Sequence, residues 1–141
     1  MQTMYIKEEM MAARQIFNPD GFKNIIADGK AVGFQFEFKA QYYRGFTLSI
    51  LHNVSVNVDG WDAAREDICI SVHGETFTLD QALTVVDPDY RWEFGEYATI
   101  LVKKDGGLAP GKHHIKAVQL IVPSYMPFPT EAVCETDFVI E

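Results

Sequence analysis

The feature that most constrains this chain is an alternation of apolar and polar residues with a period of two. From Phe34 to Lys39, aromatic residues occupy every second position and polar residues fill the positions between them. Successive side chains of a strand point to opposite faces, so this pattern is typical of a half-buried antiparallel strand. The run from Phe46 to Asp59 alternates in the same way, except that His52 interrupts its apolar face, where we expect a bend or bulge.

Further strands are expected at short, regular spacing. They cover residues 68–72, 75–79, 98–102, 114–122 and 133–140. Turn signals separate them, among which His73-Gly74 predicts a tight hairpin. The other turn signals are Asp28-Gly29, Asp59-Gly60, Asp105-Gly106-Gly107 and Pro110-Gly111. Helical character is limited to residues 78–83, with Asp80 as a candidate cap, and to the first dozen residues. The prediction is an all-β, antiparallel β-sandwich of about 7–9 strands with at most a short helix, as one domain over residues 1–141.

Composition excludes several classes of function. The formal net charge of −8 argues against nucleic-acid binding, which requires clustered Lys and Arg. The sequence contains no basic amphipathic stretch and no apolar run of about 18 residues, so it does not predict contact with a membrane. The N-terminal residues carry Glu8 and Glu9 where an export signal needs an apolar core, so we expect a cytoplasmic protein with Cys69 and Cys134 as reduced, buried thiols.

Residues 106–113 match the first seven positions of the phosphate-loop pattern G-x-x-x-x-G-K-[ST]. The eighth position is His113, which lacks the hydroxyl that would hold Mg²⁺. Pro110 has no N–H to offer a phosphate, and the residues that follow alternate like a strand instead of opening a helix. We therefore interpret this segment as a hairpin turn.

The remaining reactive side chains form no recognisable catalytic or metal-binding motif. Neighbouring residues of a strand point to opposite faces, so His113 and His114 cannot both bind one metal from a regular strand. The cysteines lie in apolar strands, where thiols are more often inert. Carboxylate pairs for a glycosidase mechanism are available in the segment from Asp87 to Glu96, but their separation decides that mechanism and the sequence does not give it. We expect no catalytic residue, no metal ligand and no cofactor in this chain.

Three segments rich in aromatic residues lie outside the predicted strands, at residues 41–45, 90–96 and 123–129. Tyr, Trp, Arg and Met are enriched at the centres of protein interfaces, and aromatic rings also stack on sugars and flat aglycones. The third segment is difficult to bury in a sheet because its prolines cannot donate hydrogen bonds. Together the three segments favour a binding or subunit surface.

Each of these residues also has a purely structural interpretation. Trp92 and Phe94 would then fill space in the core, because large aromatic side chains are commonly buried. Arg44 and Arg91 would pair with nearby acids.

Five stretches, in consistent order over residues 22–128, resemble the small β subunit of bacterial C-glycoside deglycosidases. The stretches are Gly33–Phe36 with Tyr42–Gly45, Val56–Gly60, Arg91–Glu96, Gly106–Gly111 and Ser124–Phe128. An ordered series of motifs is more specific than any single short pattern. The first dozen residues and the C-terminal strand are less typical of the family.

The resemblance implies a heteromeric carbon–carbon lyase complex. Its larger α subunit, a (β/α)8 barrel of the sugar-isomerase type, would bind a divalent metal, usually manganese, and supply the general base. The substrate would be a C-glycoside of a plant aromatic such as a flavonoid, already oxidised to the 3-keto sugar. The C3 carbonyl acidifies the neighbouring C–H, and a metal-polarised oxygen can stabilise the enolate while the bond to the aglycone breaks.

Under this hypothesis the aromatic loops meet the α subunit, in a higher-order hetero-oligomer, and close over its site. The expected contact residues are Tyr42, Tyr43, Arg44, Tyr125, Met126 and Phe128, followed by Arg91 and Trp92. The alternative is a stand-alone β-sandwich module that binds a carbohydrate or polyphenol on the same aromatic residues. A self-sufficient hydrolase is the least favoured possibility, because neither a triad nor metal spacing is present.

Overall fold

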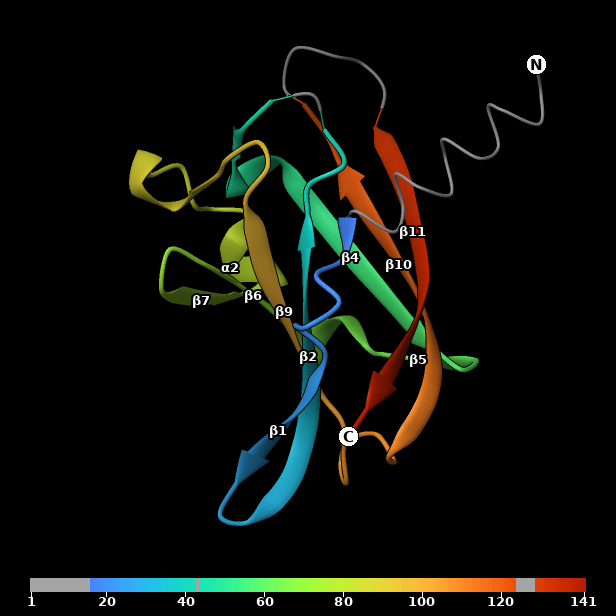
Figure 1. The fold of residues 1–141 in the computed structure, drawn as a ribbon. Coiled ribbons are helices and arrows are strands. Elements are labelled where there is room, and N and C mark those ends of the chain that lie inside the picture. The colour runs from blue at the N-terminus through green and yellow to red at the C-terminus, as the bar shows by residue number, and fades with distance from the viewer. Residues whose placement is uncertain (1–15, 43, 124–128) are drawn as a thin grey trace, which may run out of the picture.

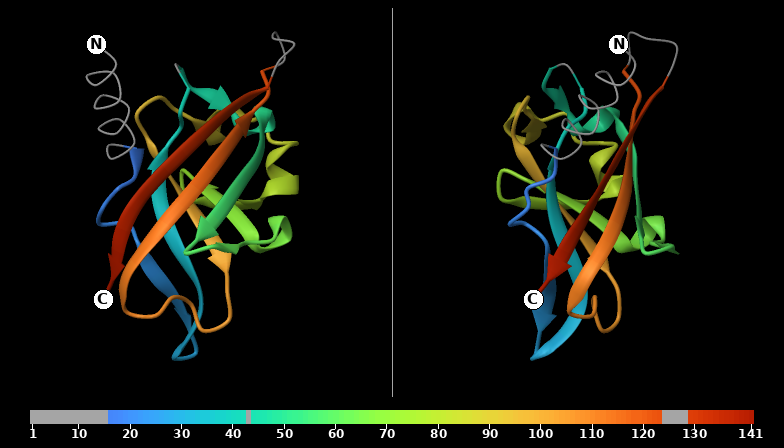
Figure 2. Two further views of the ribbon diagram at one scale, coloured as in Figure 1. Left: turned by 90° about the vertical axis from the view of Figure 1, so that its right-hand side faces the viewer. Right: turned by 45° about the vertical axis from the view of Figure 1, so that its right-hand side comes forward.

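The computed structural model describes residues 16–42, 44–123 and 129–141. These residues form two antiparallel sheets packed face to face, with a small two-stranded sheet at one end (Figures 1 and 2). The five-stranded sheet has the order β1 (Lys23–Ala27), β2 (Lys30–Lys39), β9 (Tyr97–Lys103), β6 (Ile68–Val72) and β7 (Glu75–Thr78). The four-stranded sheet has the order β11 (Thr130–Ile140), β10 (Gly111–Ile121), β4 (Leu51–Val58) and β5 (Trp61–Asp62). The predicted all-β antiparallel sandwich is confirmed.

The smaller elements lie in the connections. The two-stranded sheet pairs β3 (Phe46–Thr47) with β8 (Arg91–Trp92). Three short 3₁₀ helices are present among the described residues, η1 (Leu48–Ile50), η2 (Arg65–Asp67) and η3 (Pro88–Tyr90), together with one α-helical turn, α2 (Leu79–Ala82). None of the helices in the described part of the chain is long and apolar enough to cross a membrane.

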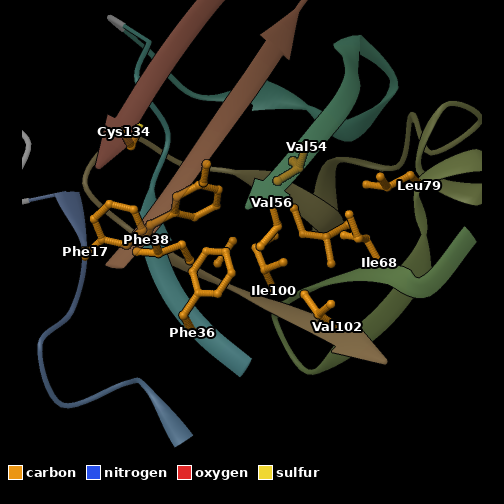
Figure 3. Close-up of a cluster of buried hydrophobic side chains, with 14 of the residues drawn as sticks. Phe17, Phe36, Phe38, Val54, Val56, Ile68, Leu79, Ile100, Val102 and Cys134 are labelled. Atoms are coloured by element: carbon orange, nitrogen blue, oxygen red, sulfur yellow. The ribbon is translucent and has the colours of Figure 1, made fainter. Parts of the chain in front are cut away.

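The alternation in β2 arises because one face of the strand is buried. Phe34, Phe36 and Phe38 are inaccessible to solvent, whereas the residues between them are partly exposed. Figure 3 shows Phe36 and Phe38 in the same interior as Val54 and Val56 of the opposite sheet. Burying a side chain of this size stabilises the fold by roughly 1.5–3 kcal/mol.

Aromatic rings also fill the seam between β2 and β11. Phe22 stacks on Phe138 of β11 with 4.2 Å between ring centroids, and Phe17 packs against both Phe22 and Phe38 at 5.8 Å. A single bridge pairs Phe17 with Phe38, so the segment before β1 continues along the edge of β2. The aromatic packing closes this side of the sandwich.

Three hairpins are connected by two-residue turns at Asp28-Gly29, Asp59-Gly60 and His73-Gly74, as predicted. Both residues of each turn have positive φ, for example 48° at His73 and 84° at Gly74. Turns of this handedness match the twist of the flanking strands, and Gly adopts such angles at no steric cost. The registers of β1–β2, β4–β5 and β6–β7 are set in this way.

The run from Phe46 to Asp59 is not one continuous strand. It divides into β3, the 3₁₀ helix η1 and β4, so that Leu51, rather than Ile50, is fully buried. Opposite β10, Leu120 pairs with Asn53 and Ile121 pairs with Leu51, which leaves His52 as an extra, exposed residue. The bulge expected at His52 is confirmed.

The helical turn begins two residues earlier than a cap at Asp80 would place it. Thr78 is the N-cap of α2, and its hydroxyl accepts a hydrogen bond from the backbone N–H of Gln81 at 3.1 Å. The Gln81 side chain accepts from the backbone N–H of Thr78 at 2.9 Å, completing a capping box. The prediction of Asp80 as the cap is therefore wrong, because Gln81, three residues after Thr78, forms the capping box with Thr78.

The interpretation of residues 106–113 as a hairpin turn is also wrong. β9 and β10 belong to different sheets, so residues 104–110 cross from one sheet to the other. Asn24 fixes this crossing, since its side chain donates to the carbonyl oxygen of Leu108 at 2.9 Å and accepts from the Leu108 N–H at 2.8 Å. Turn residues show that the chain reverses, but not which sheet the next strand joins.

Candidate partner-binding surface

The described parts of the first two aromatic segments meet at one end of the sandwich, which we call the loop end. Here β2 ends, β9 begins, β10 ends and β11 begins, at the top of Figure 1. Lys39 pairs with Tyr97, and Phe46 pairs with Trp92 in the small sheet. The third segment lies between Ile121 and Thr130, whose pairing places its two ends at the same end of the sandwich.

Four of the predicted contact residues fall outside the described residues. They are Tyr43, Tyr125, Met126 and Phe128. The other four are Tyr42, Arg44, Arg91 and Trp92, and their surroundings differ.

Tyr42 and Arg44 stand at the surface of the loop end. Tyr42 is half-buried, and its ring meets Phe46 edge-on with 5.7 Å between centroids. Arg44 is exposed. A Cβ on the next residue, Gly45, would lie 2.9 Å from the Glu93 Oε1 atom and 3.2 Å from the Arg91 Nη2 atom. The first aromatic segment therefore lies directly against the second.

Arg91 belongs to β8 and points toward Glu93. Its Nε atom donates to the Glu93 carboxylate at 2.7 Å, and both side chains are partly exposed. An exposed pair of this kind contributes little to stability, about 0–1 kcal/mol. Both charges remain accessible to a partner. The pairing of Arg91 with a local acid also agrees with the structural interpretation.

Trp92 lies in the core. Only 1% of its surface is exposed, and its ring packs against Phe38 and Phe46 at 5.6 and 5.7 Å between centroids. Its indole N–H donates to the backbone carbonyl oxygen of Glu96 at 3.0 Å. A partner chain could reach this side chain only after rearrangement of the sandwich, so Trp92 supports the loop end from beneath.

Phe94, two residues further on, has the opposite environment. Phe94 is 71% exposed, so the structural interpretation that placed it in the core together with Trp92 is wrong for this residue. The signal that separates the two is Gly95, whose φ of +83° ends the alternation and turns the chain. Phe94 is thus a surface residue of the loop end that the prediction missed.

A buried amide connects the loop end to the core. Gln119 of β10 is fully buried, and its side-chain nitrogen donates to the Lys39 carbonyl oxygen at 2.9 Å. Its side-chain oxygen accepts from the backbone N–H of Gln41 at 2.8 Å. The residue thereby joins the two sheets at the point where β2 leads into the first aromatic segment. Its polar side chain at an inward position of β10, between Ala117 and Ile121, is the signal that could have identified it.

A sequence model of the C-glycoside deglycosidase beta subunit family matches residues 12–125. This match covers most of the chain, including the two aromatic segments that meet around Gly45. The chain belongs to the C-glycoside deglycosidase beta subunit family.

A relative in the same family is the C-glycoside deglycosidase beta subunit of Eubacterium cellulosolvens. It is 35% identical over 115 residues, which are 81% of this chain and 77% of the relative. The family match leaves out the first eleven residues and β11, the parts that looked least typical in the sequence. As a family member, this chain is a subunit of a C-glycoside deglycosidase.

A cluster of polar side chains lies at the other end of the sandwich, which we call the histidine end. His113 lies between the Asp59 carboxylate and the Ala109 carbonyl oxygen, each at 2.6 Å. His114 lies between Asp137 at 2.7 Å and Glu135 at 3.1 Å. The two rings point to opposite sides of β10, as predicted from their adjacency.

These contacts shift several pKa values. The hydrogen bond to the Ala109 carbonyl oxygen, and then that to Asp59, raises the pKa of His113 above its usual value. Asp137 and then Glu135 raise the pKa of His114. In return, the hydrogen bond from His113 and that from the His114 backbone lower the pKa of Asp59. Each imidazole favours its charged form because its neighbours are acceptors.

Neither end assembles a metal centre from the residues that the structure describes. Within residues 16–42, 44–123 and 129–141, no group of three or more His, Cys, Asp or Glu side chains could hold a metal ion. Cys69 and Cys134 are both free thiols; Cys69 is half-buried and Cys134 is buried, and burial raises the pKa of Cys134 to about 11. A thiol with so high a pKa is a poor nucleophile near neutral pH.

Proposed function

We propose that this chain is the small accessory subunit of a heteromeric C-glycoside deglycosidase whose catalytic centre lies on a larger (β/α)8-barrel subunit. The complex cleaves the carbon–carbon bond between a 3-oxo sugar and an aromatic, flavonoid-type aglycone, and it acts in the cytoplasm as a higher-order hetero-oligomer. The observation that carries the proposal is membership of the beta subunit family together with the loop end, where aromatic and arginine side chains gather.

The chemistry divides between the two subunits. A divalent metal on the larger subunit, manganese in this proposal, supplies a Lewis acid that stabilises negative charge on oxygen. The base that removes the acidic proton beside the C3 carbonyl also belongs to the larger subunit. The small subunit contributes surface: its loop end covers the site, excludes water and holds the larger subunit in its active arrangement.

The contact residues proposed on this chain are those of the three aromatic segments. They are Tyr42, Tyr43, Arg44, Arg91, Tyr125, Met126 and Phe128, with Trp92 supporting them from the core. Tyr42 is half-buried, and exposed Arg44 and the Arg91–Glu93 pair add charge near it. An apolar centre with a charged rim is the usual anatomy of a subunit interface.

Co-expression with the larger subunit tests the proposal. The full chain should co-purify with the barrel protein and raise its turnover of a 3-oxo C-glucoside, and an Arg44→Ala variant should weaken both effects. The matched control is Lys30→Ala, which removes an exposed positive charge from the far end of β2. If the wild-type chain neither co-purifies nor raises activity, the proposal is wrong.

The same protein distinguishes the alternative of a stand-alone binding module. Titration of the isolated chain with C-glucosides, followed through tryptophan fluorescence, should give no saturable signal. Saturable binding without the larger subunit would replace the accessory-subunit proposal with the module.

A further inference from the structure

Phe94 is the most exposed of the large hydrophobic side chains that the structure describes. Its exposed fraction of 71% exceeds that of every other such residue in residues 16–42, 44–123 and 129–141. A single exposed apolar residue is common on protein surfaces and has no meaning by itself. What sets Phe94 apart is the rigidity of the turn that carries it.

The turn between β8 and β9 is fixed by hydrogen bonds on both sides of Phe94. The backbone N–H of Glu96 donates to the Glu93 carbonyl oxygen, and the backbone N–H of Glu93 donates to the Glu96 carboxylate, both at 3.1 Å. The buried Trp92 indole donates to the Glu96 carbonyl oxygen at 3.0 Å. Such a turn fixes the backbone that carries Phe94, so little backbone freedom is left to lose on binding.

His73 fixes the same turn from the β6–β7 hairpin. Its Nε2 atom lies 3.1 Å from both Glu96 carboxylate oxygens, and its Nδ1 atom lies 2.6 Å from the Asp89 carbonyl oxygen. Both partners are acceptors, so the ring satisfies both only when each nitrogen carries a proton. The hydrogen bond to Asp89 and then that to Glu96 raise the pKa of His73, and Glu93 adds to the effect from a distance.

The groups around Phe94 indicate the kind of surface that it fits. Glu93 and Glu96 flank the ring in sequence, and their charges are compensated by Arg91 and His73. The turn follows β8, which pairs with β3 next to the first aromatic segment, so Phe94 belongs to the loop end. An apolar socket with a polar rim matches a lone ring surrounded by paired charges.

We propose that Phe94 is an anchor that inserts into an apolar socket on the larger subunit, and that His73 is a positioning residue that holds this anchor through Glu96. The inference rests on the proposed function, because the larger subunit is the occupant that it requires. It adds a residue that was not among the predicted contact residues, and a role for a histidine to which the sequence analysis gave none.

The first test measures the affinity of the full chain for the larger subunit by titration calorimetry. Phe94→Ala should weaken binding by about 30-fold or more, as is typical of a central aromatic anchor. Phe94→Glu should abolish detectable binding, since it places a charge in the socket. Ile26→Ala is the matched control, because Ile26 is 62% exposed and lies on β1 at the opposite end of β2. The affinity of this variant for the larger subunit should equal that of the wild type.

The second test separates positioning from mere folding. Wild-type affinity should fall as the pH rises above about 6.5 and through the raised pKa of His73, because one of its two contacts is lost with the proton. His73→Gln should bind several-fold more weakly at pH 6 and lack this part of the pH profile. In the Phe94→Ala background, His73→Gln should have no further effect, since nothing remains to be positioned.

The outcomes distinguish the two levels of the hypothesis. If the wild-type chain does not bind the larger subunit at all, the proposed function fails and this inference fails with it. If the wild type binds but both Phe94 variants bind equally well, only the anchor is wrong. If both Phe94 variants weaken binding while His73→Gln has the same effect with and without Phe94, the role of His73 is wrong.

Discussion

The two ends of the sandwich use the same local device for different purposes. At each end an imidazole lies between two acceptors, as His113 does between Asp59 and Ala109, and as His73 does between Glu96 and Asp89. At the histidine end these contacts tie the β4–β5 turn to β10. At the loop end they support a turn that holds Phe94 in solvent.

The difference shows that a charged cluster does not identify a binding surface by itself. Around His113 and His114, each polar side chain contacts another group of the same end, and the His113 ring also stacks on Phe138. Around His73, the polar contacts leave a large apolar ring exposed. The histidine end also has exposed apolar side chains, Ile26 in β1 and Val139 in β11, so exposure alone does not distinguish the two ends. What distinguishes the candidate interface is an exposed aromatic ring on a turn that the polar network fixes.

The largest expected effect tests whether the buried Trp92 ring beneath the loop end stabilises the fold. Trp92→Ala should lower the free energy of unfolding by about 3–5 kcal/mol, because it removes a fully buried ring and leaves a cavity. Urea denaturation measures the change. Trp61→Ala, at a ring that is 37% exposed, should cost about 1 kcal/mol. A stable Trp92→Ala protein that fails to bind the larger subunit would make Trp92 a contact residue after all.

A smaller effect is expected from the amide that connects the loop end to both sheets. Gln119→Leu should cost about 2–3 kcal/mol, since it leaves the Gln41 N–H and the Lys39 carbonyl oxygen without their partner. Gln35→Leu makes the same change at a half-buried position of β2 and should cost far less. Equal stability of the two variants, by urea denaturation, would remove Gln119 as a support of the loop end.

At the histidine end, the crossing between the sheets allows a matched pair of glycine substitutions. Gly106 and Gly107 both have positive φ, of 80° and 62°, which costs a residue with a Cβ about 1–2 kcal/mol. Only at Gly107 would the new Cβ also meet the Asn24 side chain, 2.6 Å from its oxygen. Gly107→Ala should therefore lower the thermal midpoint more than Gly106→Ala, while equal shifts would contradict the role assigned to Asn24.

The smallest effect is the dependence of stability on pH. The raised pKa values of His73, His113 and His114 contribute stability that is complete below about pH 6.5 and is lost as the pH rises through their folded values. The lowered pKa values of Asp59 and Asp137 act in the opposite direction, and their contribution is lost as the pH falls below about 4.

Urea midpoints between pH 4 and pH 9 check this expectation. The wild type and Ile26→Ala should both lose stability above pH 6.5, and His113→Gln should lose less over the same range. A wild-type midpoint that is constant from pH 6 to pH 9 would show that the imidazole contacts contribute nothing.

The parts of the fold that the sequence could predict are those encoded locally. The strand β2 was predictable because one face is buried from Phe34 to Phe38, and the turn at His73-Gly74 because Gly adopts the required φ. The cap at Thr78 is also encoded locally, through Gln81 three residues later, although the prediction named Asp80. The family resemblance, which rests on the order of several short motifs, was confirmed.

The remainder depends on contacts between distant segments. No local pattern states that β10 leaves the sheet of β9, or that β3 pairs with β8 and brings Gly45 against Arg91. The environments of Trp92 and Phe94 differ because the chain turns at Gly95, which only the paired strands on either side reveal. The candidate site was thus predictable as a set of segments but not as a surface.

The buried thiol of Cys134 has a practical consequence for studying the loop end. The side-chain nitrogen of Gln41 lies 3.4 Å from the Cys134 sulfur, so this residue connects the thiol to the first aromatic segment. Alkylation of Cys134 requires both exposure and deprotonation of a group whose pKa is about 11, and it should be slow unless this segment opens. Half-buried Cys69, in β6, provides an internal reference within the same chain. The ratio of the two alkylation rates, with and without the larger subunit, would report opening of the loop end without any engineered label.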